Sequence, residues 1–217
     1  MTITLDHIFI CTAAGAAEAC ELLDFGLSEG APIQHTGQGT RSRRFFFFNA
    51  VLELLWVDDP AQVRQAPAAQ TRLWERWSGR AGQASPFGIG FRSDGRPAAP
   101  FLGWSYRPDY LPESRDVLIA DTPLNEPMWL YQTWGSRPDT AGADRQPLEH
   151  PAGLAEITGL RLIGPFGQPS AAARALAGAG LVSLEEGERH FLELVFDHGR
   201  QGMQVSFWPE LPLAFRW

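Results

Sequence analysis

The feature that most constrains the fold of this 217-residue chain is an order of elements that occurs twice. Residues 2–12, "TITLDHIFICT", are rich in β-branched and aromatic residues, which is typical of a strand. An alanine-rich helix is predicted over 13–27, with Gly26 in the expected C-cap position. Three strands are then predicted, over 31–35, 41–48 and 50–57. The same order recurs towards the C-terminus, so the chain is predicted to contain two β-α-β-β-β units.

This pattern divides the chain into four segments. The first unit is expected over 1–58, and the second unit with a C-terminal tail over 154–217. Between them we expect a helical connector and a β-rich middle section over 59–135, then a linker over 136–153. The middle section contains four strand-like stretches separated by turn residues. The predicted fold class is therefore α+β.

Composition and charge argue against several classes of function. The net charge of −7 offers no basic stripe for nucleic acid. No apolar run approaches the ~20 residues that a membrane helix requires. The two cysteines give no disulfide framework and the N-terminus shows no leader, so we expect a cytoplasmic protein in a reducing compartment. The expected partner is a small molecule, with no nucleic acid and no membrane.

The order of elements, with "LDHIFI" opening the first unit and "LELLWV" closing it, resembles the vicinal oxygen chelate superfamily. This superfamily includes glyoxalase I, extradiol dioxygenases and bleomycin-resistance proteins. The run "GQGTRSRRFFFFNAVLELLWVDDP" and the later "WSYRPDYLP", "EPMW" and "EHPAGLAEIT" are similar to glyoxalase-like domain proteins. The resemblance covers most of the chain. It implies tandem βαβββ units that form curved, partly open barrel sheets around a cavity, with the β-rich middle section inserted.

The resemblance also implies that His7 and Glu53 point into the cavity, because metal-dependent members carry a His on the first strand and a Glu on the fourth. Strand parity agrees, since it places His7 with Leu5 and Phe9 and places Glu53 with Leu55. An imidazole and a carboxylate suit one divalent Fe, Mn, Ni or Zn ion. Such an ion would serve a lyase or dioxygenase that acts on a small oxygenated molecule, and Glu53 is also a candidate general base.

The second unit departs from the metal-binding pattern. When the ends of the two alanine-rich helices are aligned, Arg161 falls where His7 would repeat. Val205 or Phe207 falls where Glu53 would repeat, depending on the residues that are matched. None of these three coordinates a divalent metal, so half of the expected ligand set is missing. A third ligand would have to come from elsewhere, and the candidates are His190, Glu193, His198 and Glu126.

The alternative function is a metal-free binding module of the bleomycin-resistance kind. In that case Arg161 would hold an anionic or polar ligand, because a guanidinium presents its donors in a fixed fork. Arg43 shares parity with Phe45 and Phe47 and is a further candidate for ligand binding. A homodimer is compatible with either function, since related folds often dimerise to complete their cavities. The role of residues 86–134 is left open.

Other aromatic and imidazole side chains have less specific signals. Aromatic residues of the middle section are able to line a ligand site, although such residues on strands are more often core: Trp104, Tyr106, Tyr110, Trp129 and Trp134. The remaining histidines are expected at the surface or in turns: His35, His150, His190 and His198.

Overall fold

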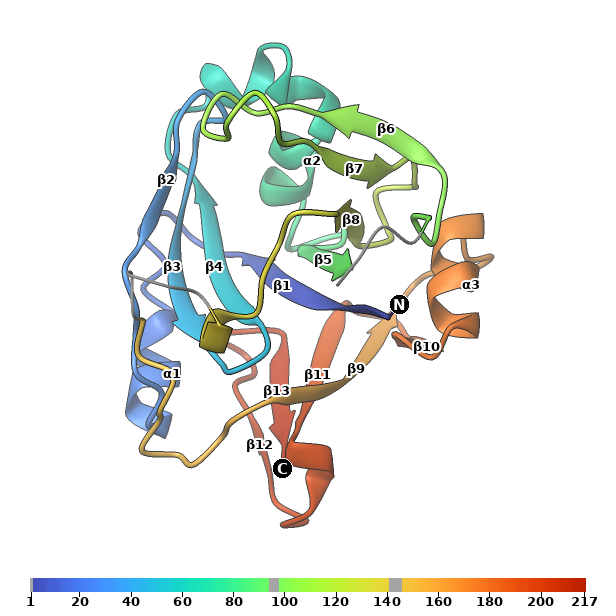
Figure 1. The fold of residues 1–217 in the computed structure, drawn as a ribbon. Helices are drawn as coiled ribbons and strands as arrows, with labels where there is room; N and C mark the ends of the chain where they lie inside the picture. Colours follow the sequence, from blue (N-terminus) through green and yellow to red (C-terminus); the bar gives the residue numbers. More distant parts are fainter. Residues whose placement is uncertain (1, 94–97, 141–145) are drawn as a thin grey trace.

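The computed structural model describes residues 2–93, 98–140 and 146–217 (Figure 1). These residues form thirteen strands in two sheets and a few short helices, so the α+β class is confirmed. Sheet A comprises β1 (Ile3–Cys11), β2 (Ile33–His35), β3 (Thr40–Phe46), β4 (Val51–Val57), β5 (Phe87–Ser93), β6 (Gly103–Tyr106), β7 (Val117–Ala120) and β8 (Met128–Gln132). Sheet B comprises β9 (Ile157–Gly164), β10 (Ser183–Glu186), β11 (Phe191–Phe196), β12 (Gln204–Ser206) and β13 (Leu213–Arg216).

Sheet A curls strongly, like half of a barrel, and its strands run in the order β2-β3-β4-β1-β5-β8-β7-β6 (Figure 1). Two halves of four strands meet at its centre, where β1 pairs antiparallel with β5. In each half the first strand pairs parallel with the fourth, β1 with β4 and β5 with β8. The other pairs within each half are antiparallel. Residues 87–132 therefore have the same strand pairing as residues 3–57.

Sheet B has a different strand order, β10-β9-β11-β13-β12. Its first strand, β9, lies between β10 and β11, whereas among the described residues of the first segment β1 pairs with β4 alone. The predicted order of elements in 154–217 is present, but the strand pairing does not confirm that this segment repeats the first unit. The middle section, which the sequence placed between two barrel units, itself forms half of the curled sheet.

The helices are short. The α-helices are α1 (Ala19–Phe25), α2 (Leu73–Ser78) and α3 (Ala171–Gly178), and the 3-10 helices are η1 (Gln62–Arg64), η2 (Ala68–Thr71), η3 (Pro138–Thr140) and η4 (Asp197–Gly199). Helix α1 begins later than predicted because residues 13–18 form turns. Gly26 ends it with φ 105°, a conformation that glycine adopts without a steric penalty. Among the described helices, none has the length and apolar character needed to cross a membrane.

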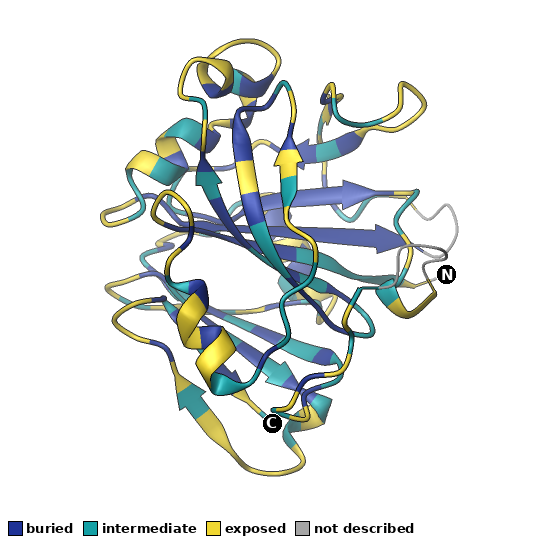
Figure 2. Ribbon diagram, turned by 90° about the vertical axis from the view of Figure 1, so that its left-hand side faces the viewer, coloured by how far each residue is buried: buried dark blue, intermediate teal, exposed yellow. Residues whose placement is uncertain are grey.

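Two hydrophobic clusters occupy the two faces of sheet A. The larger cluster fills the space between the two sheets, where Ile8 and Leu52 of sheet A meet Leu162 and Leu194 of sheet B. The smaller cluster includes Phe9, Leu55, Met128 and Leu130 of sheet A and Leu73 of α2. Helix α2 lies inside the curl of sheet A (Figure 1). Figure 2 shows the central strands as mostly buried, with exposed residues concentrated in helices and loops. Strand β1 is thus covered on both faces, as its apolar residues predicted.

Candidate ligand-binding site

The side chains of His7 and Glu53 line one small cavity inside the curl of sheet A, with a volume of about 60 Å³. The fold brings them together because β1 and β4 are neighbouring strands, with Phe9 opposite Glu53 in the register. The other lining residues are Phe9, His35, Gln38, Leu55, Leu73, Tyr106, Tyr110, Met128 and Leu130. The middle section therefore supplies one wall, and two of the aromatic residues noted in its sequence, Tyr106 and Tyr110, line the cavity.

A β-bulge at Asp6 orients the imidazole of His7. The register between β1 and β5 shifts between Leu5 and His7, which makes Asp6 the extra residue. Its carboxylate accepts a hydrogen bond from His7 Nδ1 at 2.8 Å. It also accepts hydrogen bonds from Gln132 Nε2 at 2.8 Å and from Arg92 Nη1 at 3.3 Å. Because Nδ1 is hydrogen bonded to Asp6, the Nε2 atom of His7 remains available to a ligand in the cavity.

Glu53 is tolerated among apolar neighbours because its carboxylate is hydrogen bonded and only partly buried. Ser42 Oγ on β3 donates to Glu53 Oε2 at 2.6 Å, which leaves Oε1 for the cavity. Arg44 is paired with Glu53 across the two strands, but its Nε donates to the carbonyl oxygen of Ala31 at 2.8 Å. An acceptor that is held by one neighbour and still has lone pairs available is suited to binding a ligand donor.

Strand parity predicted the two faces of β1 and β4 except for the residues of β1 that precede Asp6. Phe9 and Leu55 belong to the cluster inside the curl, as expected for neighbours of the cavity. Leu5 was expected on the same face as His7, but it packs against the cluster between the two sheets. The bulge at Asp6 is the cause, because one extra residue reverses the alternation of side chains.

A chain of hydrogen bonds orients three further polar side chains of the cavity. The hydroxyl of Tyr106 donates to Gln38 Oε1 at 3.0 Å, and Gln38 Nε2 donates to Thr40 Oγ1 at 2.7 Å. The Thr40 hydroxyl lies 3.0 Å from His35 Nδ1, to which it is free to donate. Burial lowers the pKa of His35, although the charge of Glu53 opposes this, so the imidazole is neutral at pH 7. In the tautomer that accepts this bond from Thr40, the proton resides on Nε2, where it is a donor for a ligand.

The described side chains that line the cavity do not form a complete set of metal ligands. Two imidazoles and one carboxylate line it, but among residues 2–93, 98–140 and 146–217 no group of three His, Cys, Asp or Glu side chains is arranged to hold a metal ion. The strand β8 contributes Met128 and Leu130 to the lining, and neither is a ligand of choice for the expected metals. A metal would depend on His7 and Glu53, whereas catalytic metal sites normally have three protein ligands.

Arg43 does not line this cavity. Its guanidinium forms a bidentate pair with Glu29, with 2.7 Å between Nε and Oε1, and its Nη1 donates to the carbonyl oxygen of Ala16 at 3.1 Å. Arg43 thus ties β3 to the segment that precedes α1. The structure separates this candidate ligand-binding residue from His7 and Glu53.

Arg161 also lies away from the cavity. It is on β9 of sheet B, where it forms an ion pair with Glu185 and lies 3.7 Å from a carboxylate oxygen of Glu193. The four residues considered as a third metal ligand do not line the cavity either: His190, Glu193, His198 and Glu126. Glu126, for example, accepts hydrogen bonds from the backbone and the hydroxyl of Ser170.

The remaining histidines were expected at the surface or in turns, and three of the four are buried, although His190 does lie in the connection between β10 and β11. His35, His150 and His190 are each 7% exposed, and only His198 is exposed. His150 is buried because its imidazole bonds the backbone N–H of Ser28 and the carbonyl oxygen of Phe46. For His35, the three residues "IQH" of β2 are too few for their alternation to assign a face.

We expect His7 to titrate above its ordinary pKa of 6.5. Burial lowers the pKa of His7, but the hydrogen bond and the charge of Asp6, together with the charge of Glu53, outweigh burial and raise it. Since the folded pKa is the higher one, this contribution to stability is complete below the unfolded pKa and is lost as the pH rises through the folded pKa. The midpoint is measured by NMR from the imidazole Cε1–H signal.

The variant Asp6→Asn tests the cause of this shift. It keeps an acceptor for His7 Nδ1 but removes the charge, so the midpoint of His7 should fall relative to the wild type. Asp58→Asn is the matched control, because Asp58 pairs with Arg41 at the far end of β4 and does not line the cavity. An unchanged midpoint in Asp6→Asn would contradict the orientation of His7 by Asp6.

No protein-family model and no curated protein matches this sequence. Among solved structures, the fold is similar to the crystal structure of a hypothetical protein from Staphylococcus aureus, with a TM-score of 0.53. The two sequences are 9% identical, and the match covers 100% of this chain and 99% of that chain. The likeness is one of fold alone.

Proposed function

We propose that this protein binds a small oxygen-bearing molecule in the His7–Glu53 cavity, and that it does so through hydrogen bonds without a metal. One observation supports the proposal. In each of three polar side chains of the cavity, one atom is hydrogen bonded to a neighbouring residue and another atom is left available for a ligand. Asp6 holds Nδ1 of His7, Thr40 holds Nδ1 of His35, and Ser42 holds Oε2 of Glu53. Groups oriented in this way bind a ligand without losing much side-chain freedom.

The chemistry of these groups suits a hydroxyl or carbonyl compound. His35 offers a donor at Nε2, Glu53 offers an acceptor, and the protonated form of His7 offers a second donor. A raised pKa of His7 beside the carboxylate of Glu53 also gives the pair a proton donor and a proton acceptor. The pair is therefore able to move a proton to or from a bound carbonyl compound, as a lyase of the glyoxalase type requires.

The volume of the cavity favours a small ligand. About 60 Å³ is well below the ~300–1,000 Å³ of cavities that hold drug-sized molecules. Apolar side chains, among them Phe9, Leu73 and Met128, surround the polar groups and strengthen hydrogen bonds by excluding water. Two- and three-carbon hydroxycarbonyl compounds such as glycolaldehyde and hydroxyacetone fit these properties.

The strand pairing of sheet A supports the resemblance to the vicinal oxygen chelate superfamily. Its two halves have the same pairing and enclose a cavity between them, which is the arrangement that the resemblance implies. In this proposal the paired units are residues 3–57 and 87–132, and sheet B is an addition to them. The fold likeness to the staphylococcal protein, whose function its description leaves open, adds no argument about the ligand.

The second candidate function is a metal-dependent lyase or dioxygenase that uses His7 and Glu53. One observation favours it: the imidazole of His7 donates Nδ1–H to the carboxylate of Asp6, as metal-binding histidines commonly do to orient Nε2. The shortage of a third ligand among the described residues argues against it. The two candidates differ in whether a metal is needed for the ligand to bind.

The test is a titration of chelator-treated protein with glycolaldehyde and hydroxyacetone, followed by NMR and by thermal denaturation. We expect binding in the absence of metal, and a loss of about tenfold in affinity in Glu53→Gln, because one hydrogen bond to a charged group is weakened. Glu193→Gln is the matched control, since it neutralises a strand carboxylate that does not line the cavity. Binding that appears only after addition of Fe, Mn, Ni or Zn would favour the metal-dependent enzyme. Absence of binding in both conditions, or an equal effect of the two variants, would overturn the proposal.

A further inference from the structure

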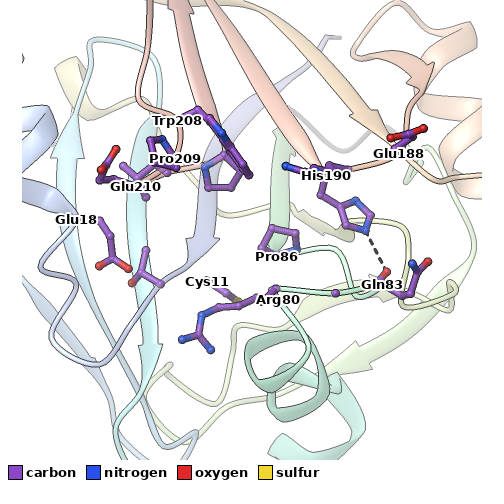
Figure 3. A pocket seen from close by; sticks show the side chains of 16 residues that line it. Cys11, Glu18, Arg80, Gln83, Pro86, Glu188, His190, Trp208, Pro209 and Glu210 are labelled. Carbon is purple, nitrogen blue, oxygen red and sulfur yellow. Dashed lines mark hydrogen bonds between the residues drawn. The ribbon is translucent and has the colours of Figure 1, made fainter.

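A second, larger cavity lies between the two sheets, on the side of the molecule where β1 ends. Its volume is about 530 Å³, within the range of cavities that hold metabolite-sized ligands. Sheet A contributes the end of β1, the turn before α1 and the segment after α2, while sheet B contributes the turns that precede β11 and β13 (Figure 3). This cavity shares no lining residue with the His7–Glu53 cavity, so its function is independent of the one proposed above.

The two walls of this cavity are held together by a buried histidine. His190, on the sheet B side, donates Nε2–H to the carbonyl oxygen of Gln83 on the other side at 3.0 Å (Figure 3). Burial lowers the pKa of His190, and the charge of Arg76 lowers it further although the bond to Gln83 opposes both. The neutral imidazole therefore fixes the shape of the cavity but brings no positive charge to it.

One hydrogen-bond acceptor in the wall of the cavity has no hydrogen-bond donor among the described residues. Glu18 accepts the backbone N–H of Ala13 with Oε1 at 2.9 Å, whereas its Oε2 is buried and no described residue donates a hydrogen bond to it. Figure 3 shows the carboxylate of Glu18 on the same side of the cavity as Glu210. A buried carboxylate oxygen without a partner is unfavourable, and a ligand that donates a hydrogen bond would satisfy it.

The charges around the cavity favour a cation. Three carboxylates line it, Glu18, Glu188 and Glu210, and within the described parts of the chain none forms an ion pair. The two arginines of the lining already lie over aromatic rings, Arg80 at 4.8 Å from the centre of Trp77 and Arg189 at 5.6 Å from that of Trp208. Negative charge is thus in excess, and the net charge of the chain has the same sign.

An aromatic side chain stands beside these carboxylates. Trp208 is 49% exposed, and together with Pro209 it forms an apolar surface next to Glu210 (Figure 3). Arg189 already lies over one part of this indole, and the exposed remainder is able to pack against the apolar parts of a ligand. Charge, an unsatisfied acceptor and an aromatic surface are therefore present in a single cavity.

We infer that this cavity binds an organic cation, specifically a primary ammonium compound with an apolar or aromatic body. The ammonium group donates to Oε2 of Glu18 and is balanced by Glu210, while the body packs against Trp208 and Pro209. A metal ion fits less well, because no three His, Cys, Asp or Glu side chains of the described residues are arranged to coordinate one.

The test uses the whole chain and two probes of similar size and opposite charge, 2-phenylethylammonium and 3-phenylpropanoate. Binding is followed by NMR through the indole N–H signal of Trp208, which the variant Trp208→Phe identifies. We expect the cation to shift this signal at millimolar concentration and the anion to leave it in place. Glu18→Gln should weaken binding of the cation about tenfold or more, because the amide oxygen stays on Ala13 and the NH2 group that replaces Oε2 cannot accept a hydrogen bond from the ammonium.

Glu18→Gln preserves the acceptor for Ala13, so the variant keeps the local turn. Glu21→Gln is the matched control, since Glu21 is exposed on α1 and does not line the cavity. Equal binding of the two probes, no shift of Trp208 by the cation, or equal affinities in the Glu18 and Glu21 variants would each overturn the inference. Loss of hydroxycarbonyl binding at His7 and Glu53 would leave it unaffected, because the two cavities have separate linings.

Discussion

Replacing Asp6 with alanine is expected to lower the free energy of unfolding by about 3–5 kcal/mol. The carboxylate is 13% exposed and is the acidic partner of Arg92, whose side chain is 5% exposed. Without it, the buried guanidinium loses this counter-charge, while its bond from Nη2 to the carbonyl oxygen of Asn49 remains. His7 and Gln132 lose an acceptor as well. Urea denaturation of the wild type and the variant measures the difference.

An exposed ion pair provides the control for this prediction. Glu185 pairs with Arg161 on sheet B, and the two side chains are 51% and 39% exposed. Solvent screens such a pair, so Glu185→Ala should change the free energy of unfolding by less than about 1 kcal/mol. Similar free energies of unfolding for the two variants would contradict the predicted contribution of the buried Asp6–Arg92 pair to stability.

Replacing Gly90 with alanine is expected to cost about 1–3 kcal/mol and to displace the imidazole of His7. Gly90 lies opposite His7 in the β1–β5 pair, and a Cβ atom there would be 2.4 Å from Cε1 and 2.6 Å from Nδ1 of the imidazole. Gly88 is equally restricted, because its Cβ would be 2.0 Å from the ring of Phe9. Both glycines allow β5 to pass closely beneath side chains of the cavity.

Gly178→Ala is the matched control, and its effect should have the opposite sign. Gly178 ends α3 and has no heavy atom within 4 Å of the added Cβ, so alanine should stabilise the chain by about 0.5–1 kcal/mol. Denaturation curves give both changes, and the His7 imidazole signals report the displacement in Gly90→Ala. A stabilised Gly90→Ala variant with unchanged His7 signals would show that this contact is not close.

The sequence predicted the strands of the first segment because their residues are strongly β-branched and aromatic. That His7 and Glu53 share a cavity was implied by the family resemblance, and strand parity agreed with it. The bulge at Asp6 was not predictable in this way. A bulge depends on the register between β1 and β5, which are far apart in the sequence, and alternation within one strand contains no information about it.

The role of the middle section was missed for a different reason. The alignment of two units relied on their alanine-rich helices, and the described residues between β5 and β6 contain no helix to align. A signal was nevertheless present in "FGIGF", where Gly88 and Gly90 alternate in a strand, because such glycines often mark a close approach of another element. Arg161 was assigned to the cavity through the same alignment, and its strand belongs to the other sheet.

The position of β1 at the junction of the two halves of sheet A has a consequence for biosynthesis. As the chain leaves the ribosome, β1 gains β4 as a partner first, and its other edge stays unpaired until residues 87–93 have emerged. That edge belongs to a strand whose Ile8 and Ile10 are completely buried in the finished fold. Open apolar strand edges pair readily with other chains. The nascent protein therefore exposes an edge that is able to associate with other chains from the emergence of β4 until that of β5.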